Sequence, residues 1–156
     1  MSVGTTVLEQ HRTHVAGRSV WRPWLAAWSG ATVIAIANGI ARRALYEERV
    51  GPMRAHYLAT ATLLIVLTAY IWVLSGRWPI RSRRSALLIG LTWMALTIVF
   101  EFGLGHYVAG EPWGKLLEQY DIRRGYVWVG IPLWMLLAPA LMRPARQQRI
   151  DQEVPG

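Results

Sequence analysis

Long apolar stretches, separated by short clusters of charged residues, make up most of this chain. Four stretches approach or exceed the ~20 apolar residues that an α-helix needs to cross a bilayer: 24–41, 56–75, 85–107 and 125–142. Residues 57–76 contain no charge, whereas a helix of a soluble bundle would carry a charged face. The pattern predicts an all-α integral membrane protein, a four-helix bundle in residues 24–142, with tails at 1–23 and 143–156.

The segment between the third and fourth apolar stretches has a pattern of its own. Pro112 suits the first turn of a helix, and apolar residues then recur at helical spacing while polar residues take the other face. We therefore predict a short amphipathic helix at the outer membrane surface, with a plain connector as the alternative. Its apolar face consists of Trp113, Leu116, Leu117 and Tyr120.

Small residues recur every four positions in the first apolar stretch, at Ala27, Ala31, Ala35 and Gly39. Small side chains in this register let membrane helices approach closely, because helix association in lipid depends on packing. The stripe is expected to face another helix of the same chain, and a second subunit stays an alternative.

The composition supports a membrane location. Hydrophobic residues make up 53% of the chain and charged residues only 17%. The absence of Cys excludes disulfides, thiolate metal ligands and Cys nucleophiles. The nine Trp, and a basic complement that is Arg apart from Lys115, indicate a bacterial source, so the predicted location is the bacterial inner (plasma) membrane.

The basic residues predict the orientation. Their distribution is uneven, with the larger share placed before the first stretch, between the second and third, and after the fourth. Positive residues favour the cytoplasmic side, so both termini are predicted to be cytoplasmic. The net charge of +8 is thus explained without nucleic acid. The expected partner is the lipid bilayer, and a homo-oligomer or a larger membrane complex is the open alternative.

Glu101 lies inside the third apolar stretch, where an ionisable side chain must be paired, neutralised or placed in a polar cavity. Counting ~1.5 Å per residue along antiparallel helices brings other polar residues to its level near the outer leaflet. The simplest arrangement is an ion pair between Glu101 and Arg42 or Arg43. A structural pair, an ion or ligand site, and a catalytic acid or base all stay open. The predicted polar cluster is Asn38, Arg42, Arg43, His56, Thr97, Glu101 and His106.

The predicted cluster does not match the usual patterns of a metal site, a haem site or a nucleophilic active site. Glu101 and His106 are five residues apart, about 140° around a helix, which does not suit chelation of a metal. No pair of His residues lies deep in facing helices for haem, and no Ser occupies a nucleophile motif. The sequence therefore predicts no metal, no cofactor and no catalytic residue.

A broader pattern supports a family resemblance. It runs over about residues 24–142 and includes Asn38-Gly39, Gly90-Leu91-Thr92-Trp93, Phe100-Glu101-Phe102, Gly105-His106, Trp113, Tyr120 and Trp128. In these features the chain resembles a family of small, uncharacterised four-helix bacterial inner-membrane proteins. That family has Arg followed by Glu near the end of the first helix, whereas Arg42 here is followed by Arg43. The resemblance implies the fold and the location, and no activity.

Three classes of function remain. The leading hypothesis is a non-enzymatic accessory subunit or envelope factor whose polar layer holds the bundle together. The second is an oligomeric small transporter or channel component in which Glu101 binds a cation or proton. The third is an enzyme acting on a lipid head group, with Glu101 and His106 as acid and base.

Overall fold

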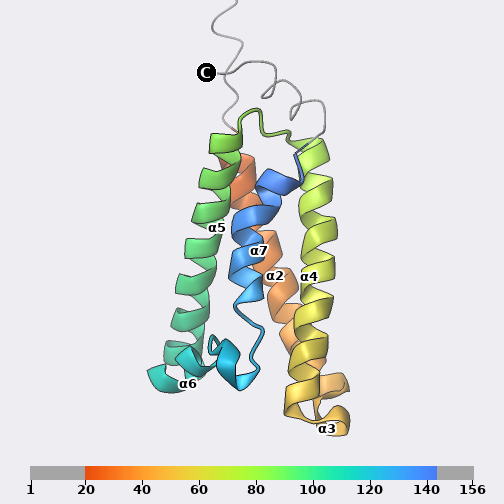
Figure 1. Ribbon diagram of the computed structural model, residues 1–156, viewed down its shortest axis with the longest axis vertical. Coiled ribbons are helices and arrows are strands. Elements are labelled where there is room, and N and C mark those ends of the chain that lie inside the picture. Colours follow the sequence, from red (N-terminus) through yellow and green to blue (C-terminus); the bar gives the residue numbers. More distant parts are fainter. Residues whose placement is uncertain (1–19, 144–156) are drawn as a thin grey trace, which may run out of the picture.

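The structure is a computed structural model that describes residues 20–143, which form helices and turns with no strand among them. The all-α prediction is therefore confirmed over this range, while most of the predicted tails lies outside it. In chain order the helices are α2 (Trp21–Leu45), α3 (Glu47–Val50), α4 (Pro52–Arg77), α5 (Arg83–Gly103), the π-helix η1 (Leu104–Val108), α6 (Trp113–Glu118), the 3₁₀-helix η2 (Ile122–Arg124) and α7 (Gly130–Leu141) (Figure 1).

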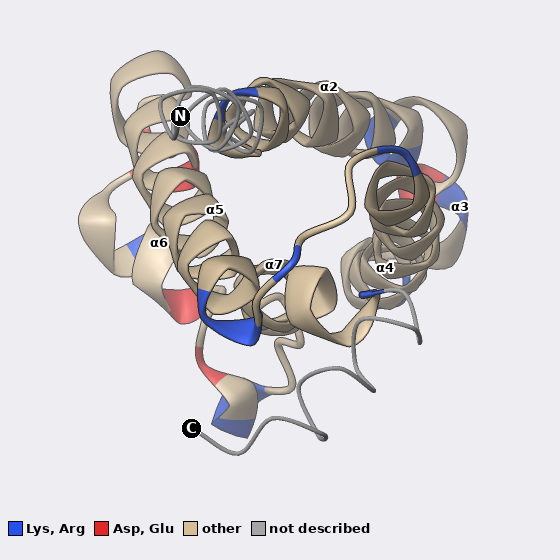
Figure 2. Cartoon of the chain, turned by 90° about the horizontal axis from the view of Figure 1, so that it is seen from above, with Lys and Arg blue, Asp and Glu red and all other residues tan. Residues whose placement is uncertain are grey.

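Three helical segments are long and apolar enough to cross a membrane: Trp21–Leu45, Pro52–Arg77 and Arg83–Val108. They coincide with the first three predicted spans, and the third consists of α5 continued by η1. Helices of 25 or 26 residues measure about 38 Å, which exceeds the ~30 Å hydrocarbon core of a bilayer. Figure 2 shows that the charged residues gather toward the helix ends and connections, leaving the helix bodies largely uncharged.

Local sequence signals explain where these helices begin and end. Gly51 adopts a positive φ of 84°, and Pro52 then occupies the first turn of α4, where no backbone N–H is needed. The α4 helix ends at Arg77, just before the Trp78-Pro79 pair, because a residue preceding Pro is disfavoured in the helical region. Ser82 caps α5 by accepting a hydrogen bond from the Ser85 backbone N–H at 3.0 Å.

The two ends of the described chain meet at one end of the bundle, together with the α4–α5 connection (Figure 1). Trp24 Nε1, near the start of α2, donates a hydrogen bond to Trp78 O at 3.1 Å. Arg143, just after α7, donates to the Ile80 and Arg81 carbonyls at 3.2 and 2.7 Å. The short connections α3 and α6 lie at the opposite end (Figure 1).

The fourth predicted span differs from the structure. Of residues 125–142, only Gly130–Leu141 is helical, and these 12 residues rise about 18 Å, too little to cross a bilayer as a helix. Gly125 has a positive φ of 86° after η2, and an irregular segment then leads to the first turn of α7. Irregular backbone is tolerated at membrane depth only where protein buries it or where it lines a cavity.

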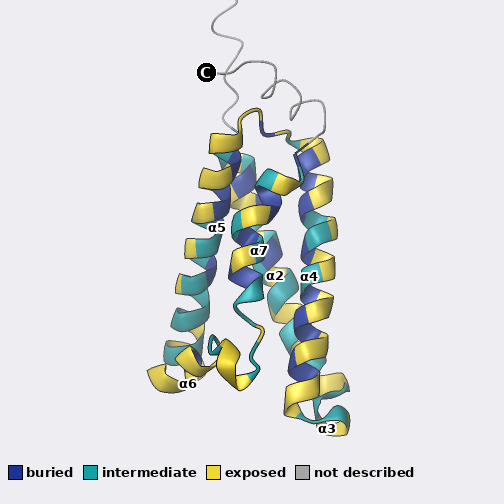
Figure 3. Cartoon of the chain, viewed as in Figure 1, coloured by how far each residue is buried: buried dark blue, intermediate teal, exposed yellow. Residues whose placement is uncertain are grey.

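The core lies between α7 and the longer helices. Gly90 of α5 packs so closely against the Leu136 backbone of α7 that a Cβ at this position would collide with it. The outward faces carry exposed apolar side chains such as Val33, Ile65 and Val99, which are 65 to 70% exposed (Figure 3). This distribution suits a surface that faces hydrocarbon.

Candidate functional site

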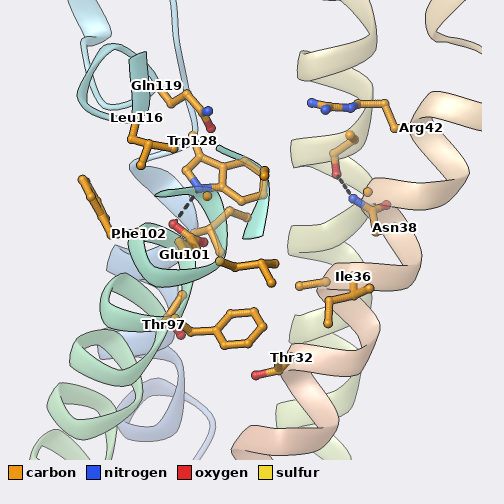
Figure 4. Close-up of a pocket in the computed structure, with 18 of the residues that line it drawn as sticks. Thr32, Ile36, Asn38, Arg42, Thr97, Glu101, Phe102, Leu116, Gln119 and Trp128 are labelled. Carbon is orange, nitrogen blue, oxygen red and sulfur yellow. Dashed lines mark hydrogen bonds between the residues drawn. The ribbon is translucent and has the colours of Figure 1, made fainter. Parts of the chain in front are cut away.

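The helices α2 and α5 touch near the end at which both begin and separate toward the other end. Trp93 Nε1 donates to Trp24 O at 3.0 Å, and one turn further along Trp28 Nε1 donates to Thr97 Oγ1 at 3.2 Å. Beyond these contacts α2 is bonded to α4 instead, where Asn38 Nδ2 donates to a backbone carbonyl at 3.0 Å. Figure 4 shows the α2 and α5 side chains facing each other across the resulting space.

A cavity of about 370 Å³ occupies this space, with walls from α2, α4, α5, the α6 segment and α7. Six of the seven residues of the predicted polar cluster line it. They are Asn38, Arg42, Arg43, His56, Thr97 and Glu101.

The cavity is polar at one end and apolar at the other. His56 lies at the start of the second turn of α4, and Leu67, which also lines the cavity, lies 11 positions further along, about 16 Å deeper. The walls at the depth of Leu67 are largely apolar, formed by Ala31, Ala35, Ile131 and Met135, and Thr32 and Thr97 are the polar residues beside them. A ligand that matches this lining would have a polar head and an apolar tail.

The cavity also reaches the side of the bundle. Ile36 and Ile40 on α2 line it and are 41% and 63% exposed, and Leu104 on η1 lines it and is 40% exposed. These three side chains lie on helices that form opposite walls. The opening is therefore lateral, between α2 and the end of α5.

Glu101 is held by two donors from the segment that follows α5. Tyr120 Oη donates to its Oε2 at 2.5 Å, and Trp128 Nε1 donates to the same oxygen at 2.9 Å. The other oxygen, Oε1, receives no hydrogen bond from residues 20–143. One carboxylate oxygen is thus fixed, and the second remains able to accept a hydrogen bond.

The Tyr120 hydroxyl keeps its proton and so remains a hydrogen-bond donor to Glu101. Burial, and then the neighbouring Glu101 carboxylate, raise the pKa of the Tyr120 phenol above its ordinary value of 10.0. The phenol therefore stays protonated at neutral pH and keeps donating to Glu101.

The expected ion pair between Glu101 and Arg42 or Arg43 does not form. Arg42 Nε instead lies 3.4 Å from Glu47 Oε2, and among the described residues Arg43 forms no ion pair. The physical reason is the separation of α2 from α5, which places Arg42 and Glu101 on opposite walls (Figure 4). Glu101 finds its partners on the closer segment instead.

His56 is the most deeply buried member of the cluster, at 7% exposure. Its Nε2 is buried and has no hydrogen-bond partner among residues 20–143. Its ring packs edge-on against Tyr126, with centroids 5.4 Å apart. Because buried polar atoms are nearly always bonded, this nitrogen is a hydrogen-bonding group that a molecule in the cavity would satisfy.

His106 is the one predicted cluster residue that does not line the cavity. Its Nδ1 donates to Glu111 O at 2.9 Å, and its ring stacks on Trp113 with centroids 4.2 Å apart. Its contacts thus join η1 to the start of α6. The placement gives no support to His106 as a catalytic partner of Glu101.

The predicted amphipathic helix corresponds to α6, although the helix is shorter than the pattern suggested. Leu116 is buried and lines the cavity, and Tyr120 reaches Glu101 just beyond the helix. Trp113 and Leu117 are 47% and 59% exposed. The inner half of the predicted face closes the cavity, and the outer half is free to contact lipid.

Sequence reasoning did not find the partners of Glu101. The helical spacing predicts Tyr120 only as part of an apolar face, and no spacing in the sequence links Trp128 to Glu101. Buried Tyr and Trp side chains usually bond through their polar atoms, which was the available signal. No pattern in the sequence predicts the π-helix η1, although such irregularities are frequent at functional sites.

The arrangement supplies binding groups. Guanidinium groups lie on the α2 wall and a carboxylate on the α5 wall, and within residues 20–143 no cluster of three metal-ligating side chains occurs. Comparison of the chain with protein-family models, curated proteins and solved structures finds no match, so no family is assigned.

Proposed function

We propose that this chain is a non-enzymatic, multi-pass protein of the bacterial inner membrane, an accessory or envelope factor, and that it works by holding a small amphiphilic molecule in the cavity. In this proposal three helices cross the bilayer and α7 packs among them as a partial fourth. Both termini lie in the cytoplasm, and the cavity therefore opens at the outer leaflet.

One observation carries the proposal: the cavity gathers charged side chains that do not satisfy one another. Glu101, inside the apolar α5, has no ion-pair partner within the described chain, and His56 Nε2 is buried without a hydrogen bond there, while Arg43 lines the same cavity but is exposed. A purely structural cluster would be expected to pair the Glu101 charge, because an unpaired charge within an apolar span is costly in a membrane. A bound molecule would supply the missing partners.

Native mass spectrometry in a mild detergent tests this proposal with a matched pair of variants. Gly39 lines the cavity and Gly103 does not, while in both cases a Cβ would meet nothing within 4 Å. We expect the wild-type protein to retain a molecule of defined mass, Gly39→Phe to lose it and Gly103→Phe to keep it. Retention of that molecule by Gly39→Phe, or a wild type without any bound molecule, would contradict the proposal.

A second candidate function is transport of a cation or proton by an oligomer. The free Oε1 of Glu101 favours it, because a carboxylate without a counter-charge can accept a cation. Proteoliposomes would then show a flux of protons, Na⁺ or K⁺ that Glu101→Gln abolishes. We expect no flux from the wild-type protein, since the proposed role of the cavity is binding.

A further inference from the structure

We infer that the ligand is a zwitterionic phospholipid of the phosphatidylethanolamine type, with its phosphate on the α2 wall, its ammonium at Glu101 and an acyl chain along the apolar walls. This inference rests on the proposed binding function and gives its ligand a chemical class.

The α2 wall provides the phosphate site. The Nε of Arg42 faces Glu47, but its terminal nitrogens have no hydrogen-bond partner in residues 20–143, and neither has the Arg43 guanidinium. Guanidinium groups bind phosphate through paired N–H donors. Arg42 is partly buried and Arg43 is exposed, and both line this wall, so their guanidinium groups provide donors for a phosphodiester.

The α5 wall provides the cation site. Tyr120 and Trp128 both donate to Oε2 of Glu101, which fixes the carboxylate and leaves Oε1 open. A primary ammonium has three N–H donors and a positive charge, so it would satisfy this oxygen and offset the buried negative charge. A choline head group has the charge but no N–H donor, and a glycerol head group has donors but no charge.

The remaining lining matches the rest of a lipid. His56 lies at the polar end, with its ring 6.2 Å from that of Trp128, so its unbonded Nε2 adds a polar group at the level of the head group. Deeper walls such as Leu67 and Met135 would contact an acyl chain. The lateral opening at Ile36, Ile40 and Leu104 would let the second chain lie in the bilayer.

A lipid panel tests the inference on delipidated protein in detergent. Phosphatidylethanolamine should raise the melting temperature by roughly 5 to 10 °C at a hundredfold excess over its Kd. Phosphatidylcholine and phosphatidylglycerol should each raise it less. Glycerophosphoethanolamine, which has the head group without chains, should give no comparable shift. An equal shift from it would assign the cavity to a soluble zwitterion and overturn the lipid.

Single substitutions distinguish the contribution of the α2 wall to lipid binding from that of the α5 wall. Arg43→Gln should weaken the response to every phospholipid, whereas Glu101→Gln should remove the preference for ethanolamine over glycerol. Arg49→Gln, which lies on α3 and does not line the cavity, should change neither. If Glu101→Gln does not fold, Glu101→Asp, which keeps the charge but shortens the side chain, should reduce the same preference.

The outcomes distinguish this inference from the proposed function. A retained molecule that is lost in Gly39→Phe but does not have the mass of a phospholipid would overturn the inference and leave binding in the cavity standing. An identical response to all three phospholipids in the wild type would overturn the inferred pairing of ammonium with Glu101.

Discussion

At the scale of single residues, the site depends on which groups donate hydrogen bonds to the Glu101 carboxylate. The sequence singles out this carboxylate as a residue that requires explanation, because acidic groups are costly in an apolar span. It did not identify the donors. Which of the many Trp, Tyr and Arg side chains reaches Glu101 depends on the separation of α2 and α5, a tertiary property that helical spacing does not encode.

Tyr120→Phe should therefore destabilise the protein. The change removes one of the two donors to Glu101 Oε2 and leaves the ring in place, so the expected cost is roughly 1 to 3 kcal/mol of unfolding free energy. Thermal melting in detergent measures it. Tyr107→Phe is the control, since Tyr107 is 79% exposed and its hydroxyl forms no hydrogen bond with the described residues. Equal melting temperatures for the two variants would contradict this account of Glu101.

Arg42 and Glu101 should act independently in stability. Arg42 is paired with Glu47 and lies across the cavity from Glu101, so Glu101→Gln and Arg42→Gln should have additive effects in delipidated protein, within about 0.5 kcal/mol. A double-mutant cycle, with free energies of unfolding obtained from thermal melting, measures the coupling between Arg42 and Glu101. Clear rescue of Glu101→Gln by Arg42→Gln would show that the two charges are paired after all.

At the scale of elements, apolar length predicted α2, α4 and α5 well, because each contains an apolar stretch that approaches or reaches bilayer length, and residues 57–76 carry no charge at all. The limits of α7 were not predictable in the same way. Residues 125–142 are apolar throughout, so composition does not show that the helix begins only at Gly130. The positive φ of Gly125 and the bond from Trp128 to Glu101 fix that start, and both depend on the fold.

The packing of α5 on α7 should be sensitive at Gly90. A methyl group there would collide with the Leu136 backbone, which cannot move aside as a side chain could. Gly90→Ala should therefore cost about 1 to 3 kcal/mol, as overpacking usually does. Gly103→Ala has open space and should be neutral or slightly stabilising, because Ala favours helix. Similar melting curves for both variants would refute this close contact of α5 with α7.

At the scale of the whole molecule, the cavity results from two structural features together. α2 and α5 are joined by Trp24, Trp28 and Trp93 at one end, and the π-helix and α6 close the other end over Glu101. The stripe of small residues on α2 has two uses. Ala27 is buried in the core, Ala31 is buried and also lines the inner end of the cavity, and Ala35 and Gly39 line the cavity further along.

The proposed orientation can be checked with single cysteines, because the chain has none. Glu48 on α3 and Arg84 at the start of α5 are exposed and lie at opposite ends of the bundle. A membrane-impermeant maleimide should label Glu48→Cys in intact cells and Arg84→Cys only after permeabilisation. The reverse result would invert the orientation and place the cavity at the cytoplasmic leaflet.

The central claim, that the cavity holds an amphiphile, is tested most directly by protection of a cysteine placed inside it. In delipidated protein, Gly39→Cys should react with a water-soluble methanethiosulfonate, whereas Ala27→Cys, buried in the core, should not. Phosphatidylethanolamine should slow the reaction at Gly39→Cys at least tenfold and leave Gly103→Cys unchanged. A Gly39→Cys that reacts equally fast with and without lipid would contradict the account.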